Sequence, residues 1–367
     1  MTIGIETYSV PKPSLPVEPV EMDIADVAFG GAGVGRIDGK ACFIKFTIPG
    51  ERVRGRLVRD HSKYSEAELQ EVITPSPDRI VPVCEYAGNC GGCSYQHIDY
   101  SRQLEIKSKQ VEEALKRVGG FTDVPMRPII ASPKPYEYRN RITVHRDGRT
   151  TGFYDFRGRM LVDIAKCAIA SPAVNDMLRR LRLTHVHDGN FTLSEPLATG
   201  GFLQTNAAVA SLLLQCVQKH CPEKSGLLVD AFCGAGFFLK HLLSRFSRGI
   251  GIEWSNASIR AANRKKAENE TYLEGSVMEN LEEVLLSEDT NDTVLILDPP
   301  SQGLDKKVPE IINRCLPAQV IYVSCKPATL ARDLKLLSAN YNLEAVTPID
   351  MFPQTAEVEV VVNLVRK

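Results

Sequence analysis

The alternation of apolar and polar residues changes character along the chain. Residues 1–17 carry several prolines and no periodic pattern, which predicts a flexible tail. From about 20 to 75, short alternating runs separated by glycine-containing turns predict a small β-barrel. Residues 99–118 place apolar side chains on one helical stripe, which Gly119 and Gly120 end. The stripe consists of Leu104, Val111, Leu115 and Val118.

After about residue 205, strand-like and helical segments alternate, as they do in an open, mostly parallel α/β sheet. The segments that read as strands are 227–232, 248–254, 292–300, 318–326 and 358–367. We therefore predict an α/β fold with a Rossmann-like C-terminal domain, preceded by the barrel and by a central α+β part. The expected parts are a tail at 1–17, a barrel at 18–78, a central part at 79–205 and the α/β domain at 206–367.

Composition narrows the class of protein. Apolar residues make up 43% and charged residues 24% of the chain, which is typical of globular domains. The 44 Lys and Arg balance the 45 Asp and Glu. This excludes a protein that binds nucleic acid through an overall positive charge, but it permits a local basic surface. No apolar run reaches the roughly 20 residues that span a bilayer, and the first residues lack a secretion signal. We expect a cytoplasmic protein without membrane association or an evident obligate protein partner.

A candidate cofactor loop follows the first strand of the predicted α/β domain. Asp230 precedes Gly234 and Gly236, which permit a tight turn and close approach of a ligand to the backbone. Glu253 ends the next strand, where a carboxylate can hold ribose hydroxyls. The G-x-G-x-x-G pattern of dinucleotide sites is absent. This arrangement resembles that of class I S-adenosylmethionine methyltransferases.

A second glycine-rich stretch, residues 30–35, precedes strand-like rather than helical sequence. It therefore lacks the helix N-terminus of a phosphate site, and we interpret it as a hairpin loop.

A candidate nucleophile, Cys325, lies at the end of the strand-like segment 318–326 and precedes a predicted helix that Ser324 or Thr329 could cap. The start of that helix and the neighbouring Lys326 are expected to favour the thiolate. Asp298 ends an earlier strand and Glu359 begins the last one. We expect Cys325, Asp298 and Glu359 to meet at the C-terminal rim of one sheet.

The motifs D-P-P at 298–300, S-C-K-P-A-T-L-A-R-D at 324–333 and M-F-P-x-T-x-x-V-E at 351–359 resemble the RNA 5-methyluridine methyltransferases. The N-terminal barrel resembles the TRAM RNA-binding domain that many of them carry. The resemblance covers nearly the whole chain after residue 17 and implies an S-adenosylmethionine-dependent enzyme that methylates uracil C5 in RNA. It favours 23S ribosomal RNA, with transfer RNA as the alternative substrate.

The resemblance also implies residue roles. Cys325 would be the nucleophile that adds to uracil C6, which makes C5 nucleophilic. Glu359 would be the base that removes the C5 proton, with Glu357 as its nearby competitor. The residues expected at the cofactor, some of them shared with the uracil pocket, are Gln204, Asp230, Phe232, Gly234, Glu253, Ser276 and Asp298.

Three cysteines in a glycine-rich loop, Cys84, Cys90 and Cys93, need a fourth ligand to form a closed metal site, and Cys167 is the candidate. The resemblance favours a [4Fe-4S] cluster on these four residues, and zinc is the alternative. The spacing of the first two cysteines does not match the Cys-x3-Cys-x2-Cys motif of radical S-adenosylmethionine enzymes.

Arginine and aromatic residues intermingle from 136 to 159 and predict an RNA-binding face, because arginine binds phosphate and aromatic rings stack on bases. A second basic strip is expected on the barrel at Arg52, Arg54, Arg56 and Arg59.

Two other functions remain open. D-P-P-S is similar to the D-P-P-Y of amino-group methyltransferases, which need no thiol. Phe237 and Ser301 depart from the family pattern and leave room for an RNA-binding protein with a degenerate catalytic domain.

Overall fold

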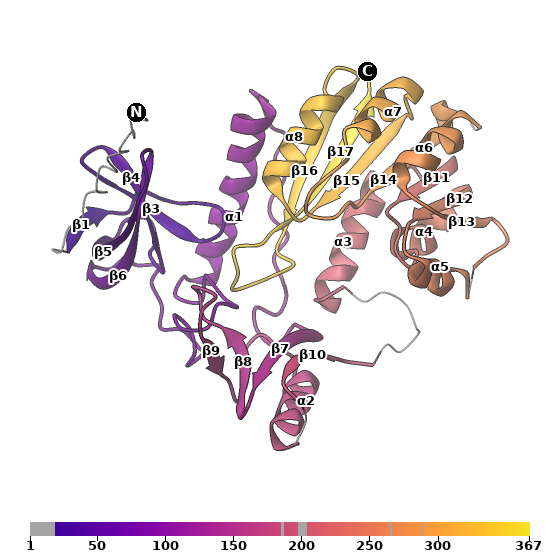
Figure 1. Ribbon diagram of the computed structural model, residues 1–367. Helices are drawn as coiled ribbons and strands as arrows, with labels where there is room; N and C mark the ends of the chain where they lie inside the picture. The colour runs from indigo at the N-terminus through magenta and orange to yellow at the C-terminus, as the bar shows by residue number, and fades with distance from the viewer. Residues whose placement is uncertain (1–18, 185–186, 197–203, 265, 288) are drawn as a thin grey trace, which may run out of the picture. The chain divides into compact units, whose positions relative to one another are not determined.

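The computed structural model describes residues 19–184, 187–196, 204–264, 266–287 and 289–367 (Figure 1). The tail expected at 1–17 lies outside them. Internal contacts divide the chain into two units, Met1–Ile80 and Val81–Lys367. Within the described residues, no helix is long and apolar enough to cross a membrane.

The first unit contains one six-stranded sheet in the order β1-β5-β6-β4-β3-β2. Its strands are β1 (Val20–Asp23), β2 (Asp26–Val27), β3 (Ala32–Ile37), β4 (Lys40–Lys45), β5 (Arg52–Asp60) and β6 (Tyr64–Thr74). Alternate side chains point inward, and the buried ones are Met22, Ile24, Cys42, Ile44, Val53 and Ala67. The sheet curls until β1 meets β3, since a Cβ on Gly35 would lie 2.8 Å from the Met22 side chain. This is the barrel-like architecture that the alternating pattern predicts.

The arginines of β5 do not form the expected basic strip. Each is paired with a glutamate of an adjacent strand, and the pairs are Arg52–Glu21, Arg54–Glu21, Arg54–Glu71, Arg56–Glu68 and Arg59–Glu66. These pairs could not be predicted from the sequence, because the glutamates belong to β1 and β6, which become neighbours of β5 only in the folded sheet. This surface is therefore a ladder of mixed charge.

The second unit begins with a cysteine-bearing loop and helix α1 (Tyr100–Ala114), which continues as a π-helical turn at Leu115–Gly119. Gly120 ends it with a φ of 76°. The helix is confirmed, but its buried face differs from the predicted stripe. Gln103 and Lys107 are fully buried, whereas Val118 is 44% exposed.

A four-stranded antiparallel sheet in the order β10-β7-β8-β9 follows. Its strands are β7 (Arg141–Asp147), β8 (Thr150–Tyr154), β9 (Leu161–Asp163) and β10 (Gly189–Ser194). Helix α2 (Pro172–Leu183) packs on this sheet through Val174 and Leu178. The strand character predicted for 136–164 is confirmed.

The C-terminal part is a seven-stranded sheet in the order β13-β12-β11-β14-β15-β17-β16. The strands are β11 (Ser225–Ala231), β12 (Phe246–Glu253), β13 (Glu270–Glu274), β14 (Thr293–Leu297), β15 (Gln319–Ser324), β16 (Tyr341–Ile349) and β17 (Glu359–Arg366). The first five are parallel, and β17 is antiparallel to β15 and β16. All five predicted strands are confirmed. The two missed strands, β13 and β16, are the outermost ones, which lack the continuous apolar runs of buried parallel strands.

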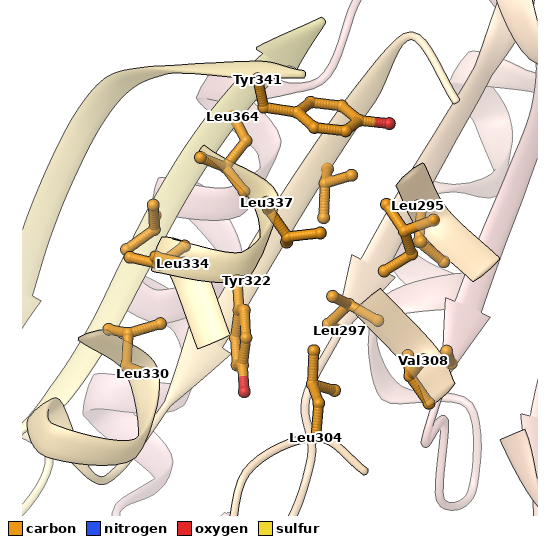
Figure 2. Packing of buried hydrophobic residues seen from close by; sticks show 14 of the residues in the cluster. Leu295, Leu297, Leu304, Val308, Tyr322, Leu330, Leu334, Leu337, Tyr341 and Leu364 are labelled. Atoms are coloured by element: carbon orange, nitrogen blue, oxygen red, sulfur yellow. The ribbon is translucent and has the colours of Figure 1, made fainter. Parts of the chain in front are cut away.

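Helices cover both faces of this sheet (Figure 1). One layer consists of α1 together with α6 (Val277–Leu286), α7 (Lys307–Cys315) and α8 (Pro327–Leu337). The other consists of α3 (Ala207–His220), α4 (Phe237–Leu242) and α5 (Asn256–Asn263). Short 3-10 turns stand at Leu243–Arg245 and Thr290–Asp292. Figure 2 shows the first layer, where Leu330 and Leu334 of α8 pack near Tyr322 of β15.

Candidate active site

Five side chains singled out by the sequence stand at one edge of the large sheet. Asp230 lies at the end of β11, Glu253 ends β12, and Asp298 directly follows β14. Cys325 directly follows β15, and Glu359 begins β17. Because β17 runs antiparallel to β15, the first residues of β17 lie beside the last residues of β15. The fold therefore brings all five to one rim, which the sequence had predicted for Cys325, Asp298 and Glu359.

The loop after β11 is held in an unusual backbone conformation. Phe232 has a φ of 67°, in the left-handed region that a large side chain adopts only under constraint. Gly234 and Gly236 have φ values of 55° and 83°. A Cβ on Gly236 would lie 2.5 Å from the Tyr272 hydroxyl, so a side chain does not fit there.

Glu253 joins this loop to the end of β12. Its carboxylate accepts hydrogen bonds from the Gly234 amide (3.0 Å) and the Ser255 amide (2.8 Å). A carboxylate has about four acceptor positions, so two remain for the hydroxyls of a ligand.

Two buried oxygen atoms at the same edge have no hydrogen-bond partner among the described residues. They are Oδ1 of Asp230 and Oγ of Ser276. Ser276 precedes α6 without capping it, and the neighbouring Gly275 amide donates to the Glu253 carbonyl (3.1 Å). Burial raises the pKa of Asp230 to about 8, and the charges of Asp298 and Glu253 contribute. Buried polar atoms are normally paired, so these oxygens fit the polar groups of a nucleoside-type cofactor.

Trp254 is a residue that sequence reasoning missed. It follows Glu253 directly, is the only tryptophan of the chain, and is 75% exposed. A large aromatic ring so exposed beside a candidate ribose site is available for a flat ligand. The sequence feature that could have revealed Trp254 is its position directly after Glu253, the acidic residue that ends a strand.

Gln204 lies between the small antiparallel sheet and α3. Asn140 Nδ2 donates to its carbonyl oxygen (2.8 Å), which fixes its backbone, and its side chain is half-buried. Residues 201–203, which directly precede Gln204, lie outside the described residues.

Cys325 and Glu359 occupy the same level on adjacent strands. Ser324 pairs with Val360 across β15 and β17, and Cys325 and Glu359 follow and precede that pair. Glu359 is 8% exposed, whereas its competitor Glu357 is exposed to solvent. The position of Glu359 beside the half-buried Cys325 therefore favours it over Glu357 as the partner of the thiol.

The electrostatic environment of Cys325 differs from the expectation. Burial raises its pKa to about 11, and the charges of Glu359, Asp298 and Glu357 add to the rise. Burial also raises the pKa of Asp298 to about 7. It raises the pKa of Glu359 well above its usual range, with Asp298 and Glu357 contributing. The expectation that Lys326 and the helix start favour the thiolate is therefore wrong for the protein alone.

The expected helix cap is also wrong, because α8 has no side-chain cap. Ser324 Oγ accepts from the Lys326 amide (3.1 Å), and Thr329 Oγ1 donates to the Lys326 carbonyl (3.0 Å).

The four cysteines expected to bind a metal line one cavity of about 400 Å³. Burial raises the pKa of Cys93 to about 12 and also that of Cys90 and Cys167, and the charges of the neighbouring cysteines contribute. No three His, Cys, Asp or Glu side chains in the described parts of the chain are arranged to hold a single metal ion. All four thiols nonetheless line one cavity, where a metal group bound by them would lie.

Arginine and aromatic side chains remain exposed on the β7–β8 hairpin and the turn after it. Arg141, Arg149 and Arg159 are exposed, and Tyr154 is 46% exposed with its ring 4.6 Å from that of His145. Other arginines turn inward: Arg139, for example, lies 5.7 Å from the centre of the Phe352 ring. The expected cationic and aromatic surface is thus present, with fewer free arginines than the sequence suggested.

The raised pKa of Cys325 leads to a prediction about the free protein. Because only the thiolate is nucleophilic, alkylation of Cys325 by iodoacetamide should accelerate about tenfold per pH unit towards the pKa near 11. Glu357→Gln removes one contributing charge and should raise the rate at fixed pH. Mass spectrometry of the Cys325 peptide measures both, and a rate that levels off near pH 8 would contradict the assignment.

The tRNA (Uracil-5-)-methyltransferase family matches residues 271–367, and the TRAM domain matches residues 13–70. A protein named uncharacterized RNA methyltransferase from Gloeobacter violaceus is 30% identical over 96% of this chain and 99% of its own length. One from Thermosynechococcus vestitus is 29% identical over 94% and 97%. The solved tRNA (uracil-54, C5)-methyltransferase of Pyrococcus abyssi, in complex with S-adenosyl-L-homocysteine, shares the fold. Its TM-score is 0.70 at 22% identity, over 94% of this chain and 100% of that one. The chain belongs to the RNA 5-methyluridine methyltransferases, S-adenosylmethionine-dependent enzymes that act on RNA and here carry an N-terminal TRAM domain.

Proposed function

We propose that this enzyme forms 5-methyluridine in 23S ribosomal RNA by covalent catalysis through Cys325. The observation that carries the proposal is the meeting of Cys325 and Glu359 on adjacent strands, next to Asp298. An amino-group methyltransferase would not need a thiol at this position.

The reaction is divided among the side chains of the rim. Cys325 loses its proton to solvent and adds as the thiolate to C6 of a flipped-out uracil, and the electron pair of the C5–C6 bond moves onto the C4 carbonyl, so C5 becomes nucleophilic. S-adenosylmethionine supplies the methyl group that C5 takes. Glu359 then removes the C5 proton, the C5–C6 double bond re-forms and the sulfur leaves as thiolate. The raised pKa of Glu359 suits a base that must accept a proton and release it again.

The cofactor site is proposed at the ends of β11, β12 and β14. Asp230, Glu253 and Ser276 would bind polar groups of the cofactor, and Phe232 and Gly234 would form the loop beneath it. Gln204 and Asp298 would close the site towards the uracil. The unpaired oxygens of Asp230 and Ser276 support this assignment.

We further propose that Cys84, Cys90, Cys93 and Cys167 hold a [4Fe-4S] cluster with a structural role. The shared cavity of the four cysteines supports a common metal group, and the family resemblance favours a cluster over zinc. The family resemblance favours 23S ribosomal RNA as substrate, with transfer RNA as the second candidate. Mapping 5-methyluridine in both RNAs of a strain that lacks the protein distinguishes the two.

Covalent catalysis predicts opposite effects for the two central residues. Cys325→Ala should abolish methyl transfer and leave RNA binding intact, whereas an amino-group methyltransferase would tolerate it. Glu359→Gln should accumulate a protein–RNA adduct, seen as a slow band on a denaturing gel, because proton removal is blocked.

Glu357→Gln is the matched control for Glu359→Gln, because it removes a neighbouring exposed carboxylate. It should turn over without accumulating the adduct. Normal turnover by Glu359→Gln would remove Glu359 from the role of base.

The position of Trp254 predicts a direct signal of cofactor binding. S-adenosylmethionine should change the emission of this only tryptophan, and Trp254→Phe should remove the signal while calorimetry still detects binding. An unchanged emission at saturation would place the cofactor elsewhere. Absence of binding in calorimetry would favour an RNA-binding protein with a degenerate catalytic domain.

The cluster proposal predicts a brown protein with about four iron atoms per chain after anaerobic purification. Cys90→Ser should lose the iron, and Cys315→Ala, a buried cysteine outside the cavity, should keep it. A colourless protein with stoichiometric zinc would overturn the iron assignment.

A further inference from the structure

The loop that joins β16 to β17, residues 350–358, is buried although it has no regular secondary structure (Figure 1). Apart from the partly buried Phe352 and the exposed Glu357, all its residues are buried. Buried backbone groups need hydrogen-bond partners, and a loop cannot supply them from within a helix or sheet. Thr355 closes one turn within the loop by donating to the Phe352 carbonyl, and further partners come from a distant part of the sequence.

Four consecutive carbonyls of the loop accept hydrogen bonds from the segment 94–206. The pairs are Asn206 Nδ2 to Met351 O (3.2 Å), Lys107 Nζ to Phe352 O (3.0 Å), Tyr138 Oη to Pro353 O (3.0 Å), and the amides of Ser94 and Tyr95 to Gln354 O (3.1 and 3.0 Å). The loop is thus fixed from outside, and its conformation depends on those donors.

Gln103 of α1 binds one loop residue at two points. Its Oε1 accepts from the Gln354 amide (3.1 Å), and its Nε2 donates to the Gln354 Oε1 (3.1 Å). Gln354 has a φ of 68° and is 2% exposed, so a left-handed conformation is maintained inside the protein. Such a conformation persists only where the surroundings over-determine it, and it is common near functional sites.

One helical turn later, Lys107 forms a fully buried ion pair with Asp350, the first residue of the loop. The two atoms Nζ and Oδ1 are 2.5 Å apart, and the Tyr100 hydroxyl donates to Asp350 Oδ2 (2.8 Å). The desolvation of a buried pair offsets most of its attraction, so it contributes less to stability than to fixing one geometry.

From these contacts we propose that Gln103 and Lys107 of α1 are positioning residues for the catalytic base. Glu359 is the residue directly after the loop, so the path of residues 350–358, together with its pairing to Ile349, sets where its side chain begins. Cys325 lies outside the loop, in the short turn between β15 and α8. Loosening the loop should therefore slow proton removal by Glu359 and spare the addition of Cys325 to uracil. This inference rests on the proposed function.

RNA with 5-fluorouridine at the target separates the two steps. Its C5 carries fluorine in place of the proton, so the adduct forms by addition and methyl transfer but cannot be resolved by a base. Two variants test the positioning role: Gln103→Met, and the neutral double variant Lys107→Met with Asp350→Asn. We expect adduct formation on fluorinated RNA to be unchanged, turnover on normal RNA to fall about 10²-fold, and adduct on normal RNA to accumulate.

Lys109→Met is the matched control, because Lys109 lies on the same helix with its side chain 52% exposed. It should behave like the parent protein in both assays. Normal turnover by Gln103→Met and by the double variant of Lys107 and Asp350 would overturn the proposal. An equal loss of adduct formation and turnover, with a lowered melting temperature, would also overturn it, because that pattern indicates general damage. Failure of the parent protein to form the fluorinated adduct would instead contradict the proposed function.

Discussion

In a parallel sheet every strand presents its carboxyl end at the same edge, and this constraint assembles the active site. Asp230, Glu253, Asp298 and Cys325 are spread over almost a hundred residues of sequence, but each stands at such an end. The reversal of β17 adds Glu359 at the same level, because an antiparallel strand starts where its parallel neighbours finish. One geometric rule therefore places the four carboxyl groups and the thiol within one rim.

The same convergence produces a partly buried environment that is rich in carboxyl groups. The three carboxylates around Cys325 raise its pKa, as does its burial, so the protein by itself favours the thiol. A cationic sulfonium donor bound at this rim would offset those charges.

Helix α1 connects two regions that the sequence keeps apart. It packs in the helical layer of the large sheet, and its buried polar residues anchor the loop before Glu359. That loop also accepts hydrogen bonds from Ser94 and Tyr95, directly after Cys93. The segment that carries the cysteines and the segment that carries the base are therefore held together through Gln354.

The sequence by itself determined the barrel, the helix at 99–118, the five inner and C-terminal strands and the residues of the rim, because periodicity and strand ends are local features. It missed the outermost strands β13 and β16, whose sequences lack a continuous apolar run. Only the tertiary structure decided that the arginines of β5 are paired, that Cys325 has a raised pKa, and that Gln103 and Lys107 point inward. Each depends on side chains from distant segments, and charge and burial are set by those neighbours rather than by the residue's own pattern.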